Sequence, residues 1–208
     1  MAAKILLPLG KDFRRWLLAG SLAAVVTGVL FIILLTFPLV VFEGDFLNGG
    51  VAITWYGLKN YGEPVYHPGL ASIPFLSIPT LCVALFNITV GFLTVFRTWR
   101  SRTINHILVE ILIGALEVCV IFTGAFFSLR LNVIHAVSVL PTEVNGVSSA
   151  GLLVVQGSVR SETFSSILIS QFYPLAFLSV LLIILAAIIG YEAAKALETL
   201  AEKENEKT

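Results

Sequence analysis

Two acidic residues stand inside an otherwise apolar run of this sequence. The run covers about residues 107–129, and it contains Glu110 and, seven positions later, Glu117. A spacing of seven places two side chains on nearly the same face of a helix. Carboxyl groups in that arrangement could relay protons or cations, or they could form hydrogen bonds that hold neighbouring helices together.

Two further polar residues could complete this cluster. His106 lies four positions before Glu110, and Asn87 lies inside the preceding apolar run. At a rise of 1.5 Å per residue, Glu117 lies about 20 Å from the shared end of the two helices, Asn87 about 15 Å and Glu110 about 9 Å. No Lys or Arg is expected at the depth of Glu117, so we expect its carboxyl to be neutral and hydrogen-bonded to Asn87. The sequence therefore predicts an intramembrane polar cluster of Glu110, Glu117, Asn87 and His106.

This cluster leaves three interpretations open. The one we favour is structural, with the carboxyls bonded to a neighbouring helix or to a partner subunit. The second is a small proton- or cation-coupled channel or transporter that uses Glu117 and Glu110, in which Pro79 breaks a helix and opens an outer cavity. The third is a subunit of a redox complex that lines a quinone site.

Other catalytic and metal sites are not indicated. The sequence has no HExxH, no CxxC and no Gly-rich phosphate loop. Its three histidines, His67, His106 and His135, are not placed to face one another across a helix bundle. Cys82 and Cys119 lie inside apolar runs, where they are typical of small buried hydrophobic residues rather than of a disulfide framework. We therefore expect no enzyme activity, no metal and no cofactor.

Composition indicates that the elements carrying these residues lie in a lipid bilayer. The chain is 57% hydrophobic and 12% charged, whereas soluble domains have about 25% charged residues. Four apolar runs approach or exceed the roughly 20 residues that span a bilayer. They cover about residues 16–41, 71–96, 107–129 and 164–191. The sequence predicts an all-α membrane protein, a four-transmembrane-helix bundle that forms one membrane domain over residues 1–208.

The distribution of basic residues predicts the orientation. Ten of the 13 Lys and Arg residues lie in the N-terminal segment, the turn at 97–104 and the tail at 192–208. Basic residues favour the cytoplasmic side, so we expect a multi-pass cell-membrane protein with both termini in the cytoplasm. The connections at 43–70 and 131–163 then lie outside. The formal net charge of zero gives no reason to expect nucleic-acid binding.

Both outer connections carry strand patterns. Residues 51–56, 135–140 and 152–156 are rich in β-branched and aromatic residues or alternate with period two, and Asn48–Gly50 and Asn145–Gly146 are turn signals. We predict a small extracellular β-sheet built from both connections, whose edges could pair with another molecule. The predicted outer assembly face consists of Trp55, Tyr56, Tyr61, Tyr66, Val137, Val139 and Val154.

The layout and one short motif resemble a known family. The motif is Trp55-Tyr56-Gly57-Leu58 in the first outer connection. Together with four helices and a β-rich exterior, it resembles the claudin and peripheral-myelin-protein-like superfamily of junction and channel-accessory proteins. Two features depart from that pattern, because Lys59 replaces the second Trp of the family motif and the two outer cysteines are absent. The resemblance implies lateral assembly in the membrane and contacts made by the outer sheet.

These observations favour one function. We expect a non-enzymatic structural or accessory subunit that uses its outer β-rich face and its helix faces. Its expected partners are the lipid bilayer and either further copies of the chain, as a homo-oligomer, or a larger membrane complex.

Overall fold

The chain forms two compact units. A computed structural model describes residues 5–36, 38–43, 47–60, 62–66, 68–138, 141–144, 147–150, 160–162 and 165–205. Unit 1 comprises Met1–Leu30, Cys82–Thr123 and Ala176–Thr208, and unit 2 comprises Phe31–Leu81 and Gly124–Leu175. Each of the four long helices contributes residues to both units.

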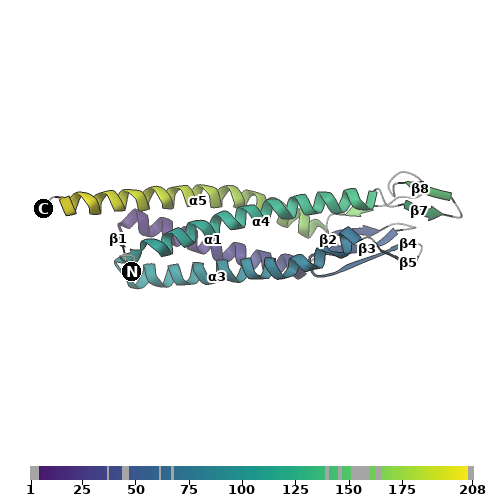
Figure 1. Cartoon of the computed structure of the whole chain (residues 1–208), viewed down its shortest axis with the longest axis horizontal. Coiled ribbons are helices and arrows are strands. Elements are labelled where there is room, and N and C mark those ends of the chain that lie inside the picture. The colour runs from purple at the N-terminus through teal and green to yellow at the C-terminus, as the bar shows by residue number, and fades with distance from the viewer. Residues whose placement is uncertain are drawn as a thin grey trace. The chain divides into compact units, whose positions relative to one another are not determined.

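The long helices are α1 (Lys11–Thr36), α3 (Ser77–Arg100), α4 (His106–Ser138) and α5 (Ser165–Asn205), as Figure 1 shows. Among the described residues, four helical stretches are long and apolar enough to cross a membrane. They are Lys11–Thr36, Pro68–Arg100, His106–Leu129 and Phe177–Glu202. This confirms the predicted four-helix layout and is typical of a multi-pass membrane protein.

The first two helices begin and end at other residues than predicted. Helix α1 begins at Lys11 and ends at Thr36, before Pro38 opens strand β2. Proline lacks the N–H that a continuing helix needs, so the helix ends ahead of it. Helix α3 begins only at Ser77, after the short helix α2 (Pro68–Ala71) and the 3₁₀ turn η1 (Ile73–Leu76).

The last two helices are longer than predicted. Helix α4 continues to Ser138, so the strand predicted at 135–140 is wrong over residues 135–138. A run of six residues can show period two by chance. Continuing the helix lets the backbone N–H and C=O groups form hydrogen bonds within the same helix. Helix α5 continues to Asn205 through most of the predicted tail, where acidic and lysine residues alternate.

Glycines bring α1 and α3 close together in unit 1. A Cβ on Gly91 of α3 would lie 2.6 Å from Val25 Cγ2 and 2.7 Å from the carbonyl oxygen of Ser21, both on α1. A Cβ on Gly28 of α1 would lie 2.7 Å from the carbonyl oxygen of Ala84 on α3. The two helix backbones therefore approach so closely that only glycine fits at these two positions.

Buried hydroxyl groups in unit 1 are satisfied by their own helices. Ser21 donates a hydrogen bond to the carbonyl oxygen of Leu17 at 2.6 Å, and Thr94 donates to that of Val90 at 2.8 Å. Thr123 donates to Cys119 in the same way. Such bonds remove the cost of placing a hydroxyl in an apolar interior.

A two-stranded sheet closes one end of unit 1. Strand β1 (Leu6–Pro8) pairs antiparallel with β6 (Thr103–Asn105), and Leu7 lies opposite Ile104. Leu7 and Ile104 are buried. The sequence patterns above did not predict these strands, because three residues are too few to show a period.

Unit 2 contains a five-stranded antiparallel sheet in the order β5-β4-β3-β2-β9. Strand β2 (Pro38–Glu43) forms mostly from residues that were predicted as the end of the first helix. The first connection supplies β3 (Leu47–Ala52), β4 (Tyr56–Asn60) and β5 (Glu63–Val65), and the second supplies β9 (Arg160–Glu162). This confirms a small sheet built from both connections.

A separate hairpin follows α4. Strand β7 (Pro141–Val144) pairs with β8 (Val147–Ala150), and Val144 lies opposite Val147. The strands flank the predicted turn at 145–146, which lies outside the described residues, as does the strand predicted at 152–156.

The predicted turn at Asn48–Gly50 is wrong, because these residues lie within β3. Gly49 has a φ of +127°, and a Cβ at this position would collide with the carbonyl oxygen of Gly57 on β4. Glycine is needed here for a close strand approach rather than for a chain reversal.

Replacing Gly49 with alanine is expected to destabilise this sheet by about 1–3 kcal/mol, because the residue would be strained and would displace β4. Amide hydrogen exchange across residues 47–60 measures the change. Gly57→Ala is the matched control, because nothing lies within 4 Å of its added Cβ. Faster exchange in both variants alike, or in neither, would contradict this account.

Candidate functional site

The His106–Glu110 pair of the predicted polar cluster lies at the start of α4. His106 opens α4, and its backbone N–H donates to the carbonyl oxygen of Ile5 at 3.1 Å. Its Nδ1 lies 3.4 Å from Oε1 of Glu110, whose side chain is 61% exposed. An exposed pair of this kind contributes little to stability, because water competes for both partners.

Asn87 does not join this cluster. Its side chain is fully buried, and its Nδ2 donates to the carbonyl oxygen of Val83 on the same helix at 2.8 Å. Its Oδ1 has no hydrogen-bond partner among the described atoms. The predicted hydrogen bond between Asn87 and Glu117 is therefore wrong.

The geometry of α4 explains why this bond is absent. Leu112, Ala115, Leu116 and Cys119 are fully buried and define the inward face of the helix. Glu117 lies on the exposed face, as Glu110 does. The spacing of seven correctly predicts a shared face for the two carboxyls, but that face is the outward one.

Glu117 lies in an apolar groove between α4 and α5. The groove has a volume of about 470 Å³. Besides Glu117, its lining consists of Ile113, Val120 and Ile121 of α4 and Leu182, Ile183, Ala186 and Ala187 of α5. Among the described residues, Glu117 has no hydrogen-bond or ion-pair partner. A carboxyl group thus stands, without a partner from the described part of the chain, on the surface of a membrane-spanning helix.

The described residues contain no continuous relay. Glu110 and Glu117 are separated by about 10 Å along α4, given the helical rise, and neither carboxyl is bonded to Asn87. Pro79 lies in the first turn of α3, where proline leaves no helical hydrogen bond unmade. The helix predicted from about residue 71 is interrupted just before Pro79, at η1, rather than at Pro79 itself.

Aromatic side chains are exposed in unit 2. Trp55, in the bend between β3 and β4, and Tyr66, which is 77% exposed, are both accessible, while Tyr56 is half-buried. Phe75 of η1 is 76% exposed and was not predicted, because it was placed in a lipid-facing helix. Tyr61 lies outside the described residues.

Hydrogen bonds and buried neighbours hold the segment around Trp55 in place. Its neighbours Ala52 and Ile53 are fully buried. The Thr54 hydroxyl donates to the carbonyl oxygen of Leu35, at the end of α1, at 2.9 Å. The backbone N–H of Ala52 donates to the carbonyl oxygen of Trp55 at 2.7 Å. These bonds hold the segment that carries the exposed Trp55 to the end of α1 and to β3.

Of the three valines assigned to the outer face, the structure describes Val137. Val137 lies in α4, so its assignment to a strand is wrong, because the helix continues through it. Val139 and Val154 lie outside the described residues.

No protein-family model matches the chain, no curated protein matches it, and no solved structure matches it. These comparisons give no support to the claudin-like resemblance, and the part of it that the structure bears out is the four-helix layout. Within the motif, Trp55 precedes β4, and Tyr56, Gly57 and Leu58 are its first residues.

The α5 wall of the groove was not predicted. Residues 175–190 showed only a plain apolar run, although small residues on a membrane helix can mark a contact face. Ala186 and Ala187 line the groove, and Gly190 lies one turn further along, where an added Cβ would be 3.8 Å from Ile113. These small residues are the signal that could have revealed the groove.

Proposed function

We propose that this chain is a non-enzymatic integral membrane subunit that assembles with further copies of itself or with a larger membrane complex. The observation that carries the proposal is the Glu117 carboxyl, exposed in an apolar groove of a membrane-spanning helix. A partner helix seated in that groove would supply the missing hydrogen-bond partner.

The cost of leaving Glu117 in contact with lipid supports this proposal. A carboxylate at the centre of a bilayer costs about 2.5–3.5 kcal/mol on insertion scales, and a neutral carboxyl without a partner is also disfavoured in hydrocarbon. A hydrogen bond between helices recovers about 1–2 kcal/mol. Ala186 and Ala187 on the opposite wall would let a partner backbone come close.

The outer sheet supplies a second contact surface in this proposal. Its edge strands β5 and β9 have three residues each, and β5 contains Glu63 and Pro64. Short, charged and proline-containing edges resist the addition of another strand. We therefore assign the outer contact to the exposed aromatic side chains Trp55, Tyr66 and Phe75, rather than to a strand edge.

The proposal includes a location. We place the chain in the cell membrane with both termini in the cytoplasm and the five-stranded sheet outside, on the distribution of basic residues. In support, β1 and the C-terminal end of α5 lie at the same end of unit 1 (Figure 1), and Arg97 and Arg100 lie in the last turn of α3. A claudin-like origin is part of the proposal, with Lys59 and the missing outer cysteines as its departures.

Photo-crosslinking tests the groove as a contact site. A photoreactive residue at Ile121, which is 67% exposed and lines the groove, is expected to give protein adducts in native membranes. The same residue at Phe92 of α3, which is 60% exposed and is not among the groove residues, is the matched control and is expected to give lipid adducts. Protein adducts of equal yield at both positions, or at neither, would contradict the proposal.

A further inference from the structure

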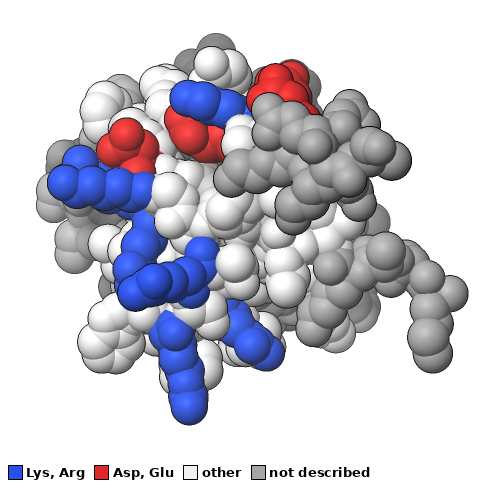
Figure 2. Space-filling view, turned by 90° about the vertical axis from the view of Figure 1, so that its left-hand side faces the viewer, with Lys and Arg blue, Asp and Glu red and all other residues white. Residues whose placement is uncertain are grey.

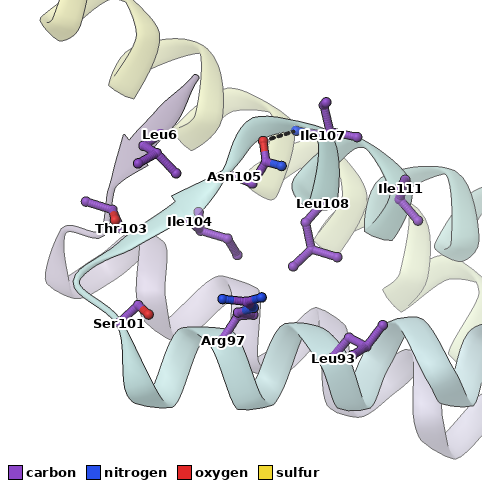
Figure 3. A pocket seen from close by; sticks show the side chains of 10 residues that line it. All are labelled: Leu6, Leu93, Arg97, Ser101, Thr103, Ile104, Asn105, Ile107, Leu108 and Ile111. Carbon is purple, nitrogen blue, oxygen red and sulfur yellow. Dashed lines mark hydrogen bonds between the residues drawn. The ribbon is translucent and has the colours of Figure 1, made fainter. Parts of the chain in front are cut away.

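We propose that unit 1 binds an anionic phospholipid in a second cavity, which Glu117 does not line. The cavity has a volume of about 530 Å³ and is bounded by the end of α3, strand β6 and the first turns of α4 (Figure 3). Its lining is amphipathic. Arg97, Ser101, Thr103 and Asn105 supply the polar part, and Leu93, Leu108 and Ile111 contribute to the apolar part.

Arg97 is the group that would bind the phosphate. Figure 3 shows its side chain rising from α3 toward the cavity, across from Ile104 and Asn105. The guanidinium forms no ion pair with any described carboxylate. A guanidinium with its donors unengaged is well suited to a phosphate oxygen. The hydroxyls of Ser101 and Thr103 line the same cavity and could donate further hydrogen bonds.

The cavity lies where a membrane meets water. Arg97 is in the last turn of the span Pro68–Arg100, and Ile107 and Ile111 are in the first turns of the span His106–Leu129. Trp99 is 78% exposed, and the Arg100 guanidinium lies 5.9 Å from the centre of the Phe96 ring. Exposed aromatic residues beside arginines are typical of the interfacial zone of a bilayer.

Charge favours an anionic occupant. Figure 2 shows Lys and Arg side chains gathered on this end of unit 1, where Arg97, Arg100 and Arg102 are exposed. Basic residues at a membrane surface attract anionic lipids. Among the described residues, Arg97 is the one arginine that lines the cavity. The nearby Arg14 guanidinium donates a hydrogen bond to the carbonyl oxygen of Trp99 at 3.1 Å.

The apolar part distinguishes a lipid from a soluble phosphate. Leu93, Ile107 and Ile111 line the cavity and are also exposed on the helix surface, so an acyl chain could continue from the cavity along α3 and α4 into the bilayer. The walls are fixed, because β6 is paired with β1 and the Asn105 side chain accepts a hydrogen bond from the N–H of Ile107 at 3.3 Å. A preformed site loses less entropy on binding.

Native mass spectrometry of the full chain tests this assignment. The chain is reconstituted in vesicles of equal phosphatidylglycerol and phosphatidylcholine, extracted, and the two retained lipids are counted. We expect about a five-fold preference for phosphatidylglycerol, the size expected for one basic residue at a membrane surface. Arg97→Gln is expected to abolish the preference, and Arg97→Lys to retain part of it.

Arg100→Gln is the matched control, because it removes the same charge from the same helix turn but does not line the cavity. It is expected to retain most of the preference. Leu108→Trp, which fills the apolar part without changing charge, is expected to lower retention of both lipids. Equal losses in Arg97→Gln and Arg100→Gln, no preference in the parent chain, or displacement of the lipid by millimolar inorganic phosphate would overturn the proposal.

Discussion

Replacing Gly91 with alanine is expected to lower the free energy of unfolding by about 1–3 kcal/mol, the usual cost of overpacking a well-filled interior. The added methyl group would lie 2.6 Å from Val25 Cγ2 and 2.7 Å from the Ser21 carbonyl oxygen. A carbonyl oxygen in a helix cannot move aside as a flexible side chain can. The α1 and α3 backbones would therefore have to separate, with loss of packing along their shared face.

Gly114→Ala is the control, because nothing lies within 4 Å of a Cβ at this helical position. Alanine is the better helix former, so this variant is expected to be more stable by about 0.5–1 kcal/mol. The same chemical change thus has opposite signs at two helical glycines. Reversible unfolding in detergent, followed by circular dichroism, measures both. A stabilised Gly91→Ala variant would contradict the close approach of α1 and α3.

Replacing Glu117 with leucine is expected to weaken association with the partner by about 5- to 30-fold, because an interhelical hydrogen bond of about 1–2 kcal/mol is lost. The same change should make the isolated chain insert more readily, since a carboxyl in contact with lipid is replaced by an apolar group. These opposite effects separate a contact residue from one that only stabilises the fold. Replacing a residue that only packs within the fold would instead lower both the association with the partner and the insertion of the isolated chain.

Energy transfer between labelled chains in vesicles, at increasing lipid dilution, measures association between copies, and co-extraction measures association with another protein. Glu117→Gln retains hydrogen-bonding capacity and is expected to lose less than Glu117→Leu. Glu110→Leu is the control, because that carboxyl is exposed beside His106 at the helix end. Unchanged association in Glu117→Leu would show that the Glu117 groove is not a contact site for the partner.

The sequence predicted the membrane helices well, because bilayer thickness imposes an apolar length that is visible without any knowledge of packing. It failed where a short pattern competes with a long element. Residues 135–138 alternate as a strand does, but α4 continues through them. The pairing of β1 with β6 was missed because each strand has only three residues.

The prediction for the polar cluster was right for the shared face of Glu110 and Glu117 and wrong for the bond to Asn87. The spacing of Glu110 and Glu117 predicts a shared helix face, and the structure has both on the exposed side of α4. Which face turns inward depends on the neighbouring helices, and depth alone does not give it. Depth suggested Asn87 as the partner of Glu117, whereas Asn87 is bonded to Val83 within its own helix. The sequence therefore predicted that Glu110 and Glu117 share a helix face, but not which way that face turns.

The central claim is that this chain functions as part of an assembly, and the mass of the native particle tests it most directly. The chain would be extracted from its native membrane together with surrounding lipid, without detergent, and weighed particle by particle. One chain has a mass of 22.6 kDa. We expect protein masses of at least two chains, or of one chain with a second protein, and a shift toward single chains in Glu117→Leu. A parent protein that carries the mass of one chain alone would contradict the account.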